Sequence, residues 1–219
     1  MSERVKRWLN PYIQKLSDFP ERIILGLDVE KDKIELNRAV SRFSHAYFEF
    51  GSGSGNHLIA RAIQEPQAAF VGFELRFKRA YRTIEKSQSK NVENTFVVKS
   101  DARKFLDFSL SIPLQGIYVN FPDPWARKRE HKHRMLTEHL LDDASRVLEK
   151  GGFVSVKTDH ESYFNDFIES AKRSKGWTLI TYTKDLHNSD YLEGNVVTEF
   201  ESLFLKQGLP ICHAKFIKD

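Results

Sequence analysis

The stretch AYFEFGSGSGNHLIARAIQ, residues 46–64, passes from an apolar run through alternating glycines into a helical pattern. The run at 46–50 is typical of a short buried strand. The apolar residues of 57–64 recur at the spacing of one helix face, and Pro66 ends that pattern. Glycines between a strand and a helix let the backbone turn sharply and approach a ligand closely. The stretch therefore predicts an α/β fold with a ligand at this turn.

The same alternation of strand and helix continues along the chain. Helical patterns occupy 76–86, a long stretch over 136–148 that Gly151 would close, and 164–171. Further buried-strand patterns lie at 69–74, 95–99, 116–121, 153–158 and 177–183. Because near-continuous apolar strands alternate with amphipathic helices, we expect a mostly parallel sheet with helices on both faces. This predicts a single-domain Rossmann-like fold over residues 46–219, preceded by a basic N-terminal extension over residues 1–45.

The positive charge is concentrated in three segments. Residues 1–16, 76–90 and 120–135 carry balances of +3, +5 and +3, whereas the whole chain carries +4, so the remainder carries −7. Basic charge collected in this way indicates a polyanionic partner, and the alternative is three solvated helix faces.

Composition excludes several other classes of protein. Cys212 is the only cysteine, which excludes an internal disulfide and a multi-thiolate metal site and fits a reducing cytoplasm. No run of 18 apolar residues is present, and the first residues lack a secretory hydrophobic region. We therefore expect a cytoplasmic protein with no membrane partner, either a monomer or a homodimer.

Carboxylates follow five of the predicted strands. They are Glu49, Glu74, Asp101, Asp123 and Asp159. Ligands of an open parallel sheet bind beyond the carboxyl ends of its strands, where strand order reverses. A single acid there is usually a helix cap or a turn former, but five in register predict a binding site.

The pattern of glycines in the turn indicates which cofactor it would bind. Gly51, Gly53 and Gly55 alternate, Asn56 replaces the last glycine of a dinucleotide fingerprint, and no P-loop lysine follows. Glu49 would repel a phosphate, so the turn favours a positively charged ligand without phosphate. S-adenosylmethionine fits that description, with Glu74 on its ribose hydroxyls and Asp101 beside its adenine. The alternative is a tight turn with no ligand.

Motifs in the C-terminal half indicate a particular family of proteins that use this cofactor. NFPDPW at 120–125 before a basic run, KTD at 157–159 and DLHNSDYLEGNVVTEFE at 185–201 resemble the tRNA (guanine-N7)-methyltransferase family. The resemblance runs from about Phe48 to the C-terminus. It implies a class I methyltransferase fold, S-adenosylmethionine as cofactor, and a guanine of the tRNA variable loop as substrate.

The resemblance also assigns residues. It gives cofactor positions to Glu49, Glu74, Asp101 and Asp123, with Asp123 facing the methyl donor as the catalytic residue. It gives substrate positions to Arg127, Asp159, Thr198, Glu199, Phe200 and Glu201. Three positions depart from the family pattern, because Ser54 and Ala126 replace its usual residues and Arg127 replaces a lysine.

The chemistry of guanine N7 suits these residues. N7 carries a lone pair and no proton, so it attacks a sulfonium methyl without a general base, and the enzyme must chiefly position the reactants. Methylation leaves the base cationic, so Asp123 and Asp159 would stabilise developing charge. Glu201 or Asp159 could accept hydrogen bonds from the guanine edge.

Some of these residues have simpler interpretations. Thr198 and Glu201 also fit a helix capping box ended by Gly208, and Thr158 and Glu161 fit another. The histidines of the basic run are more typical of a solvated face than of zinc ligands, so no metal is expected. Two other functions stay open: a class I methyltransferase for another RNA or a small molecule, and a non-catalytic RNA-binding protein.

Overall fold

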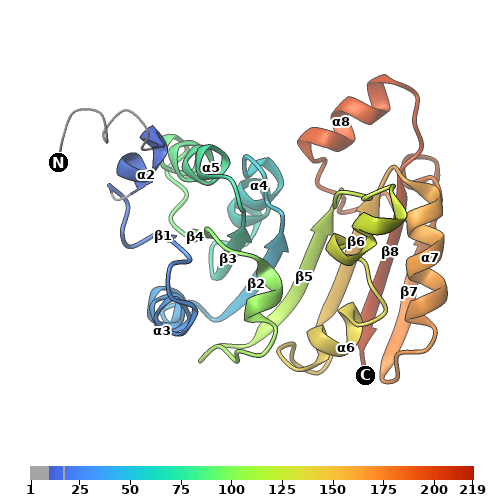
Figure 1. The fold of residues 1–219 in the computed structure, drawn as a ribbon, viewed down its shortest axis with the longest axis horizontal. Coiled ribbons are helices and arrows are strands. Elements are labelled where there is room, and N and C mark those ends of the chain that lie inside the picture. Colours follow the sequence, from blue (N-terminus) through green and yellow to red (C-terminus); the bar gives the residue numbers. More distant parts are fainter. Residues whose placement is uncertain (1–9, 17) are drawn as a thin grey trace.

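The computed structural model describes residues 10–16 and 18–219; Arg4, Lys6 and Arg7 of the basic segment 1–16 lie outside them. Within the described residues, eight strands form one sheet in the order β1-β4-β3-β2-β5-β6-β8-β7 (Figure 1). The strands are β1 (Ile23–Ile24), β2 (His45–Phe50), β3 (Ala68–Phe73), β4 (Thr95–Val98), β5 (Leu114–Asn120), β6 (Phe153–Thr158), β7 (Trp177–Thr183) and β8 (Cys212–Lys218). All six strands expected from the sequence are confirmed, and so is the mostly parallel sheet.

The order of the strands reverses between β2 and β5. From β2 the chain moves outward through β3 to β4, and it then returns to β5 on the other side of β2. All of these neighbours pair in parallel, whereas β8 runs antiparallel between β6 and β7. The reversal places the carboxyl ends of β2 and β5 side by side, which is where an open sheet of this kind binds ligands.

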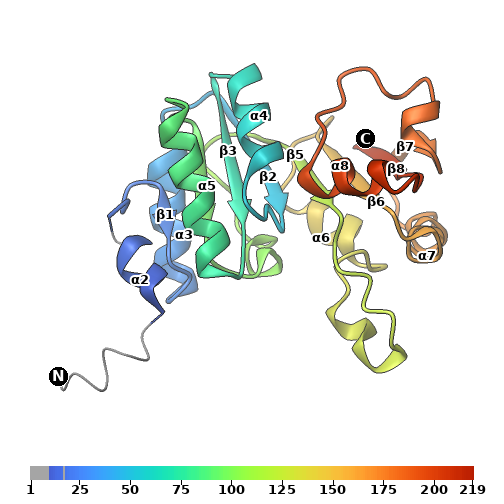
Figure 2. The ribbon, with the colours of Figure 1, turned by 90° about the horizontal axis from the view of Figure 1, so that it is seen from above.

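Helices cover both faces of the sheet (Figure 2). Buried residues of α3, α6 and α7 join the largest core cluster, and those of α4 and α5 pack in two smaller clusters. The α-helices are α2 (Pro11–Leu16), α3 (Val29–Val40), α4 (Asn56–Gln64), α5 (Phe77–Ser89), α6 (Leu140–Ser145), α7 (Glu161–Ala171) and α8 (Glu199–Lys206). The described residues also form the short 3-10 helices η1 (Ala102–Phe105), η2 (Lys128–His133) and η3 (Leu186–Asn188).

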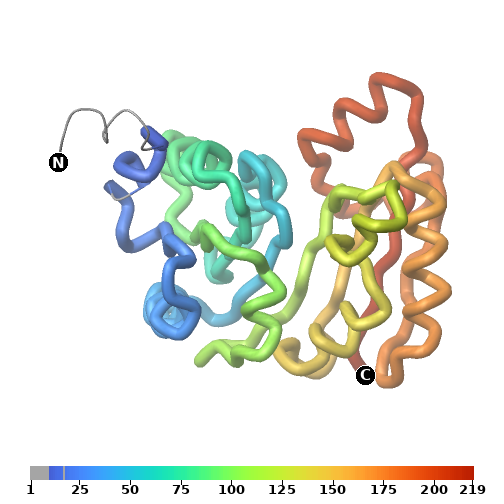
Figure 3. The backbone as a smooth tube through the Cα atoms, viewed as in Figure 1, coloured from blue at the N-terminus to red at the C-terminus, as the bar shows by residue number. Residues whose placement is uncertain are grey.

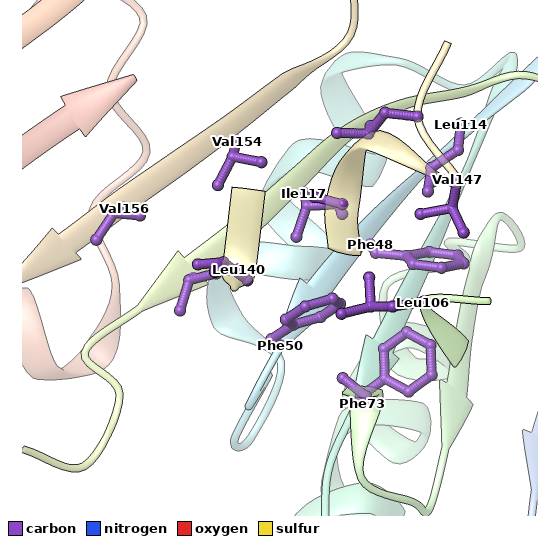
Figure 4. Close-up of a cluster of buried hydrophobic side chains, with 14 of the residues drawn as sticks. Phe48, Phe50, Phe73, Leu106, Leu114, Ile117, Leu140, Val147, Val154 and Val156 are labelled. Atoms are coloured by element: carbon purple, nitrogen blue, oxygen red, sulfur yellow. The ribbon is translucent and has the colours of Figure 1, made fainter. Parts of the chain in front are cut away.

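The alternation of side chains along β2 divides the core between the two faces. Phe48 and Phe50 lie in the largest cluster together with Phe73 and with Leu140 of α6 (Figure 4). Tyr47, directly before Phe48, joins the cluster on the side of α4. Because both faces of β2 are buried, the end of this strand is a rigid base for the residues that follow it.

The prediction of a long helix over 136–148 is wrong. Only α6 forms there, because the amide of Leu136 donates to the hydroxyl of Tyr163 at 2.7 Å and so lies outside a helix. Gly151 does not close this helix; its amide donates to the carbonyl of Lys218 at 2.8 Å, in the turn before β6. Packing against α7 and β8 therefore outweighs the local helical pattern.

The second capping box, predicted from Thr158 and Glu161, is also wrong. The N-cap of α7 is His160, whose ring nitrogen accepts from the amide of Tyr163 at 3.3 Å. Glu161 instead pairs with Lys184, 2.6 Å between carboxylate and ammonium. Asp159 is exposed between β6 and this cap.

The part of the chain before residue 46 packs on the same sheet. β1 pairs in parallel with β4, and Leu36 and Val40 of α3 lie in the largest core cluster. The guanidinium of Arg22 donates to the carbonyls of Val92 and Thr95 at 2.7 and 3.1 Å. The described portion of the expected N-terminal extension thus contributes an edge strand and core residues. The C-terminus lies at the opposite end of the sheet from α8 (Figure 3).

Candidate active site

A pocket of about 280 Å³ lies where the strand order reverses. It is lined by Glu49 and residues 51–57, by Lys78, Arg79 and Arg82 of α5, by residues 120–121, and by residues 198–200. Seven of the residues predicted from the sequence share it: Glu49, Gly51, Gly53, Gly55, Thr198, Glu199 and Phe200. The glycine turn and the C-terminal motif, about 145 residues apart in the chain, therefore form one site.

Glu49 is the buried anchor of the pocket. The residue is 2% exposed, and its Oε1 accepts from Nδ2 of Asn120 at 2.9 Å and lies 3.1 Å from Nδ1 of His57. Glu49 Oε2, Asn120 Oδ1 and His57 Nε2 are buried without a hydrogen-bond partner among the described residues. Leaving such atoms unpaired costs about 1–3 kcal/mol each, so their gathering at one pocket indicates a polar, cationic ligand.

The sequence did not predict Asn120 and His57. Asn120 is the last residue of β5, and its polar side chain at the end of an apolar strand was the available signal. His57 stands at the second position of α4, and nothing in the periodicity distinguishes it from a solvated residue.

The glycine turn takes a backbone that favours glycine at alternate positions. Gly51, Gly53 and Gly55 have φ of +73°, +57° and +78°. Glu74, directly after β3, accepts from the amides of Gly53 and Arg76 at 3.1 and 2.8 Å, which fixes the turn against the neighbouring strand. A Cβ at Gly51 or Gly53 would meet no other atom within 4 Å, so this side of the turn is open to a ligand.

Replacing Gly55 with alanine is expected to weaken binding of S-adenosylhomocysteine by about 10-fold or more. Overpacking and left-handed strain together cost about 2–6 kcal/mol, and a shift of the glycine turn that relieves them would change the pocket. Its Cβ would lie 2.4 Å from Cγ2 of Thr83 at a φ of +78°. Calorimetric titration measures the affinity. Gly194→Ala is the matched control, since Gly194 also has a positive φ but no atom within 4 Å of its Cβ position. Equal affinities in the two variants would contradict a role for this turn.

The predicted capping box at the start of α8 is confirmed. The hydroxyl oxygen of Thr198 accepts from the amide of Glu201 at 3.0 Å, and Glu201 Oε2 accepts from the amide of Thr198 at 3.1 Å. The predicted helix stop is also confirmed, since Gly208 at φ +71° follows α8 and its amide donates to the carbonyl of Leu205 at 3.0 Å.

Glu201 is fully buried and has no free acceptor position. Its Oε1 accepts from Asn195 Nδ2 at 2.8 Å and from Nε2 of His187 at 2.8 Å, and its Oε2 accepts from Nζ of Lys157 at 2.9 Å. Burial alone would raise the pKa of Glu201, but the ammonium of Lys157 and these hydrogen bonds lower it. Direct contact of Glu201 with a guanine edge does not fit this geometry. The carboxylate instead fixes α8 on β6.

The first turn of α8 closes the pocket. Glu199 accepts a hydrogen bond from the hydroxyl of Ser54 in the glycine turn, and Phe200 is 41% exposed. The guanidinium of Arg79 lies 6.0 Å from the centre of the Phe200 ring, and the ring of Phe121 lies 6.4 Å away. Figure 1 shows α8 above the ends of β5 and β6, so the helix lies at the carboxyl ends of these strands.

The other predicted site residues lie outside this pocket. Asp101 follows β4 and accepts from Nε of Arg103 at 3.0 Å; burial would raise its pKa, but Arg103 lowers it. Asp123, Arg127 and Asp159 are exposed after β5 and β6. Arg127 is 3.8 Å from the carboxylate of Glu130.

The chain around Asp123 is strained. Phe121 and Trp125, on either side of it, have φ of +51° and +43°, a region that bulky side chains rarely adopt. Strain of this kind costs about 1–3 kcal/mol per residue and is commonly found at functional sites. The turn directs the chain away from β5 into the basic segment that contains η2.

The described part of the chain contains neither a candidate metal-binding cluster nor a helix that could span a membrane. Residues 10–16 and 18–219 contain no group of three or more His, Cys, Asp or Glu side chains that could hold a metal ion. In the same residues, no helix combines the length and the apolar character that crossing a membrane requires.

Comparison with known proteins identifies the family. Residues 44–214 match the family model described as "Putative methyltransferase". The tRNA (guanine-N(7)-)-methyltransferase of Bacillus subtilis (strain 168) is 31% identical over 218 residues, covering 98% of each chain. That of Lachnoclostridium phytofermentans is 33% identical over 184 residues, covering 84% of this chain and 86% of the other. The chain belongs to the tRNA (guanine-N7)-methyltransferase family.

One relative is larger. A bifunctional glycosyltransferase/methyltransferase of Fusobacterium nucleatum is 36% identical over 197 residues, and this chain spans 90% of its own length but only 30% of that protein. The similarity therefore concerns one part of the larger protein.

Solved structures confirm the predicted class I methyltransferase fold. A 16S rRNA methyltransferase, KamB, superposes with a TM-score of 0.62 at 15% identity, covering 85% of this chain and 94% of the other. A methyltransferase from Streptococcus mutans in complex with SAH superposes with a TM-score of 0.52 at 13% identity, covering 87% of this chain and 97% of the other.

Proposed function

We propose that this methyltransferase transfers a methyl group from S-adenosylmethionine to N7 of a guanine in the variable loop of tRNA. The observation that carries the proposal is the shared pocket, in which the glycine turn meets residues 198–200 of the C-terminal motif. Family membership supports the same reaction, because relatives across several bacteria are tRNA (guanine-N(7)-)-methyltransferases.

The residues of the pocket fit the cofactor. When bound, S-adenosylmethionine supplies a methyl group on a positively charged sulfur. The unpaired Oε2 of Glu49 and Oδ1 of Asn120 are acceptors suited to its ammonium group, and the open side of Gly51 and Gly53 leaves room for it. Glu74, fixed beside the turn, would accept from the ribose hydroxyls, and Asp101 would lie by the adenine.

The residues around the pocket need to position guanine rather than deprotonate it. N7 has a lone pair and no proton, so a methyl group can be received without a general base. Asp123 and Asp159 are exposed carboxylates at the rim, and they would stabilise the positive charge that the base gains. Arg127, Thr198, Glu199 and Phe200 would hold the nucleotide, with the exposed ring of Phe200 available for stacking.

A basic segment projects from the body of the protein on the chain between β5 and α6, coloured yellow-green in Figure 2. It includes η2, none of whose residues is buried. Such a projection suits contact with the phosphates of a folded RNA, which provide affinity and orientation but no sequence information.

The triple variant Lys128→Ala/Arg129→Ala/Lys132→Ala is expected to bind tRNA more weakly, with a salt dependence flatter by about one unit per lost phosphate contact. These side chains are exposed, so melting temperature and cofactor affinity should be nearly unchanged. Fluorescence anisotropy over a series of salt concentrations measures the slope. A wild-type slope in the triple variant would show that this segment is a solvated face that does not contact the RNA phosphates.

The proposed function is tested by offering the purified chain labelled S-adenosylmethionine with bulk tRNA, ribosomal RNA or free GTP. Transfer to tRNA, with 7-methylguanosine as the labelled nucleoside, is the expected result. Transfer only to ribosomal RNA or only to GTP would indicate a different substrate class. Tight RNA binding with no transfer would indicate a non-catalytic protein. A cytoplasmic location and a monomeric or homodimeric state, expected from the sequence, belong to this proposal.

A further inference from the structure

One face of α5 carries cations into the pocket. Lys78, Arg79 and Arg82 line it together with residues 198–200 of the C-terminal motif. Lys78 and Arg82 are exposed, and Arg79 is half-buried against the ring of Phe200.

In the part of the chain that the structure describes, these cations lack a carboxylate partner. No ion pair joins Lys78, Arg79 or Arg82 to an acid within residues 10–16 and 18–219, and the first turn of α5 contains no acidic residue. Lys78 and Arg82 are one helical turn apart, and like charges at that spacing destabilise a helix by a few tenths of a kcal/mol. An anion bound between these cations would offset their mutual repulsion, so their clustering at a pocket indicates an anionic ligand.

The neighbouring lysine on this face shows a different arrangement. Lys86 donates to Asn56 Oδ1 at 2.7 Å and to the carbonyl of Ser54 at 3.1 Å, and so it fixes the glycine turn to α5. Lys86 therefore has a structural task, whereas no side-chain hydrogen bond within residues 10–16 and 18–219 holds the pocket-lining Lys78 and Arg82.

The chemistry of the cofactor and of the RNA indicates which anion the three cations of α5 bind. The pocket contains a buried carboxylate, Glu49, and its unpaired acceptors suit a cofactor without phosphate. A nucleotide that brings guanine to the pocket also brings its own phosphate and that of its neighbour. These phosphates are anions that the cations lining the pocket can bind.

We propose that Lys78, Arg79 and Arg82 form a phosphate cradle that holds the RNA backbone beside the target guanine. This inference rests on the proposed function, and it names a contact separate from the projecting segment that contains η2. Arg79 links α5 to α8, because its guanidinium lies over the ring of Phe200. The phosphate cradle would fix the nucleotide where its base is transferred, and the projecting segment would fix the remainder of the tRNA.

The test uses the double variant Lys78→Gln/Arg82→Gln, which removes two exposed cations without touching the buried face of α5. The matched control is Lys150→Gln/Lys175→Gln, which removes the same charge from exposed positions that precede β6 and β7, at the other end of the sheet. Anisotropy measures tRNA affinity against salt in the presence of S-adenosylhomocysteine, calorimetry measures affinity for that cofactor product, and methyl transfer is assayed in parallel.

The phosphate cradle predicts that tRNA affinity falls by about 10-fold or more and that the salt slope falls by about 1.4, since each single-strand phosphate contact contributes about 0.7. Cofactor affinity should match the control. A double variant with the slope of the control would overturn the inference. So would a loss confined to the cofactor, which would assign the cations to its carboxylate. If the wild type transfers no methyl to tRNA, the proposed function fails; if it transfers and the slopes agree, only the phosphate cradle fails.

Discussion

Replacing Glu49 with glutamine is expected to lower the affinity for S-adenosylmethionine by about 100-fold, because losing one partner of a buried charge contact costs about 2–5 kcal/mol. Glutamine keeps the size of the side chain but removes the negative charge at the reversal point of the sheet. Its amide also places a donor where the unpaired Oε2 now offers an acceptor. Calorimetric titration with the cofactor and with S-adenosylhomocysteine measures the change.

Melting curves separate this effect from unfolding. Glu49 is buried with one oxygen unpaired, so glutamine should leave the melting temperature of the ligand-free protein equal or higher. Glu149→Gln, an exposed change at the other end of the sheet, is the control for loss of one negative charge. If Glu49→Gln binds the cofactor as tightly as the control does, Glu49 is not a cofactor residue.

The second large effect is expected on stability, at Glu201. Glu201→Gln should reduce the free energy of unfolding by about 3–5 kcal/mol, the usual consequence of leaving one member of a buried ion pair without its partner. Glutamine can still complete the capping box with Thr198, so the loss reports the contact with Lys157 rather than the helix cap. Burial lowers the pKa of Lys157, whose side chain is 5% exposed and so depends on Glu201 for compensation.

Two comparisons make the measurement specific. Glu199→Gln removes the same charge from an exposed position on the same helix and should change stability by no more than about 0.5 kcal/mol. Adding Lys157→Met to Glu201→Gln should recover part of the loss, because no unpaired ammonium is then buried. Urea unfolding curves give both values. Equal stability of Glu201→Gln and Glu199→Gln would show that α8 is not fixed by this pair.

The sequence predicted the fold well where local pattern and tertiary packing agree. The strand that ends at Phe50 and the glycines after it combine apolar periodicity with a backbone that favours glycine, and both were confirmed. The helix over 136–148 failed because the tyrosine hydroxyl that holds Leu136 outside it comes from residue 163. β8 was not predicted, although its apolar residues alternate with histidine and lysine in the manner of a half-buried strand.

The site was only partly predictable for the same reason. The five carboxylates after the strands were correctly expected at one rim, but Glu49 alone of them lines the pocket. The local motif around Glu201 predicts a base contact or a helix cap. Its burial depends on Lys157, 44 residues earlier, which no local pattern reveals. Asn120 and His57 were missed because their importance comes from meeting Glu49 across three separate elements.

The most direct measurement of the central claim compares two tRNA transcripts that differ at one ring atom. One contains ordinary guanine, and in the other every guanine is 7-deazaguanine, in which a C–H group replaces N7. Both are incubated with the purified chain and labelled S-adenosylmethionine, and the incorporated methyl is counted. The proposed function predicts stoichiometric incorporation into the ordinary transcript and none into the deaza transcript at equal binding affinity. Equal incorporation into both would show that the methyl group goes to another atom and would contradict it.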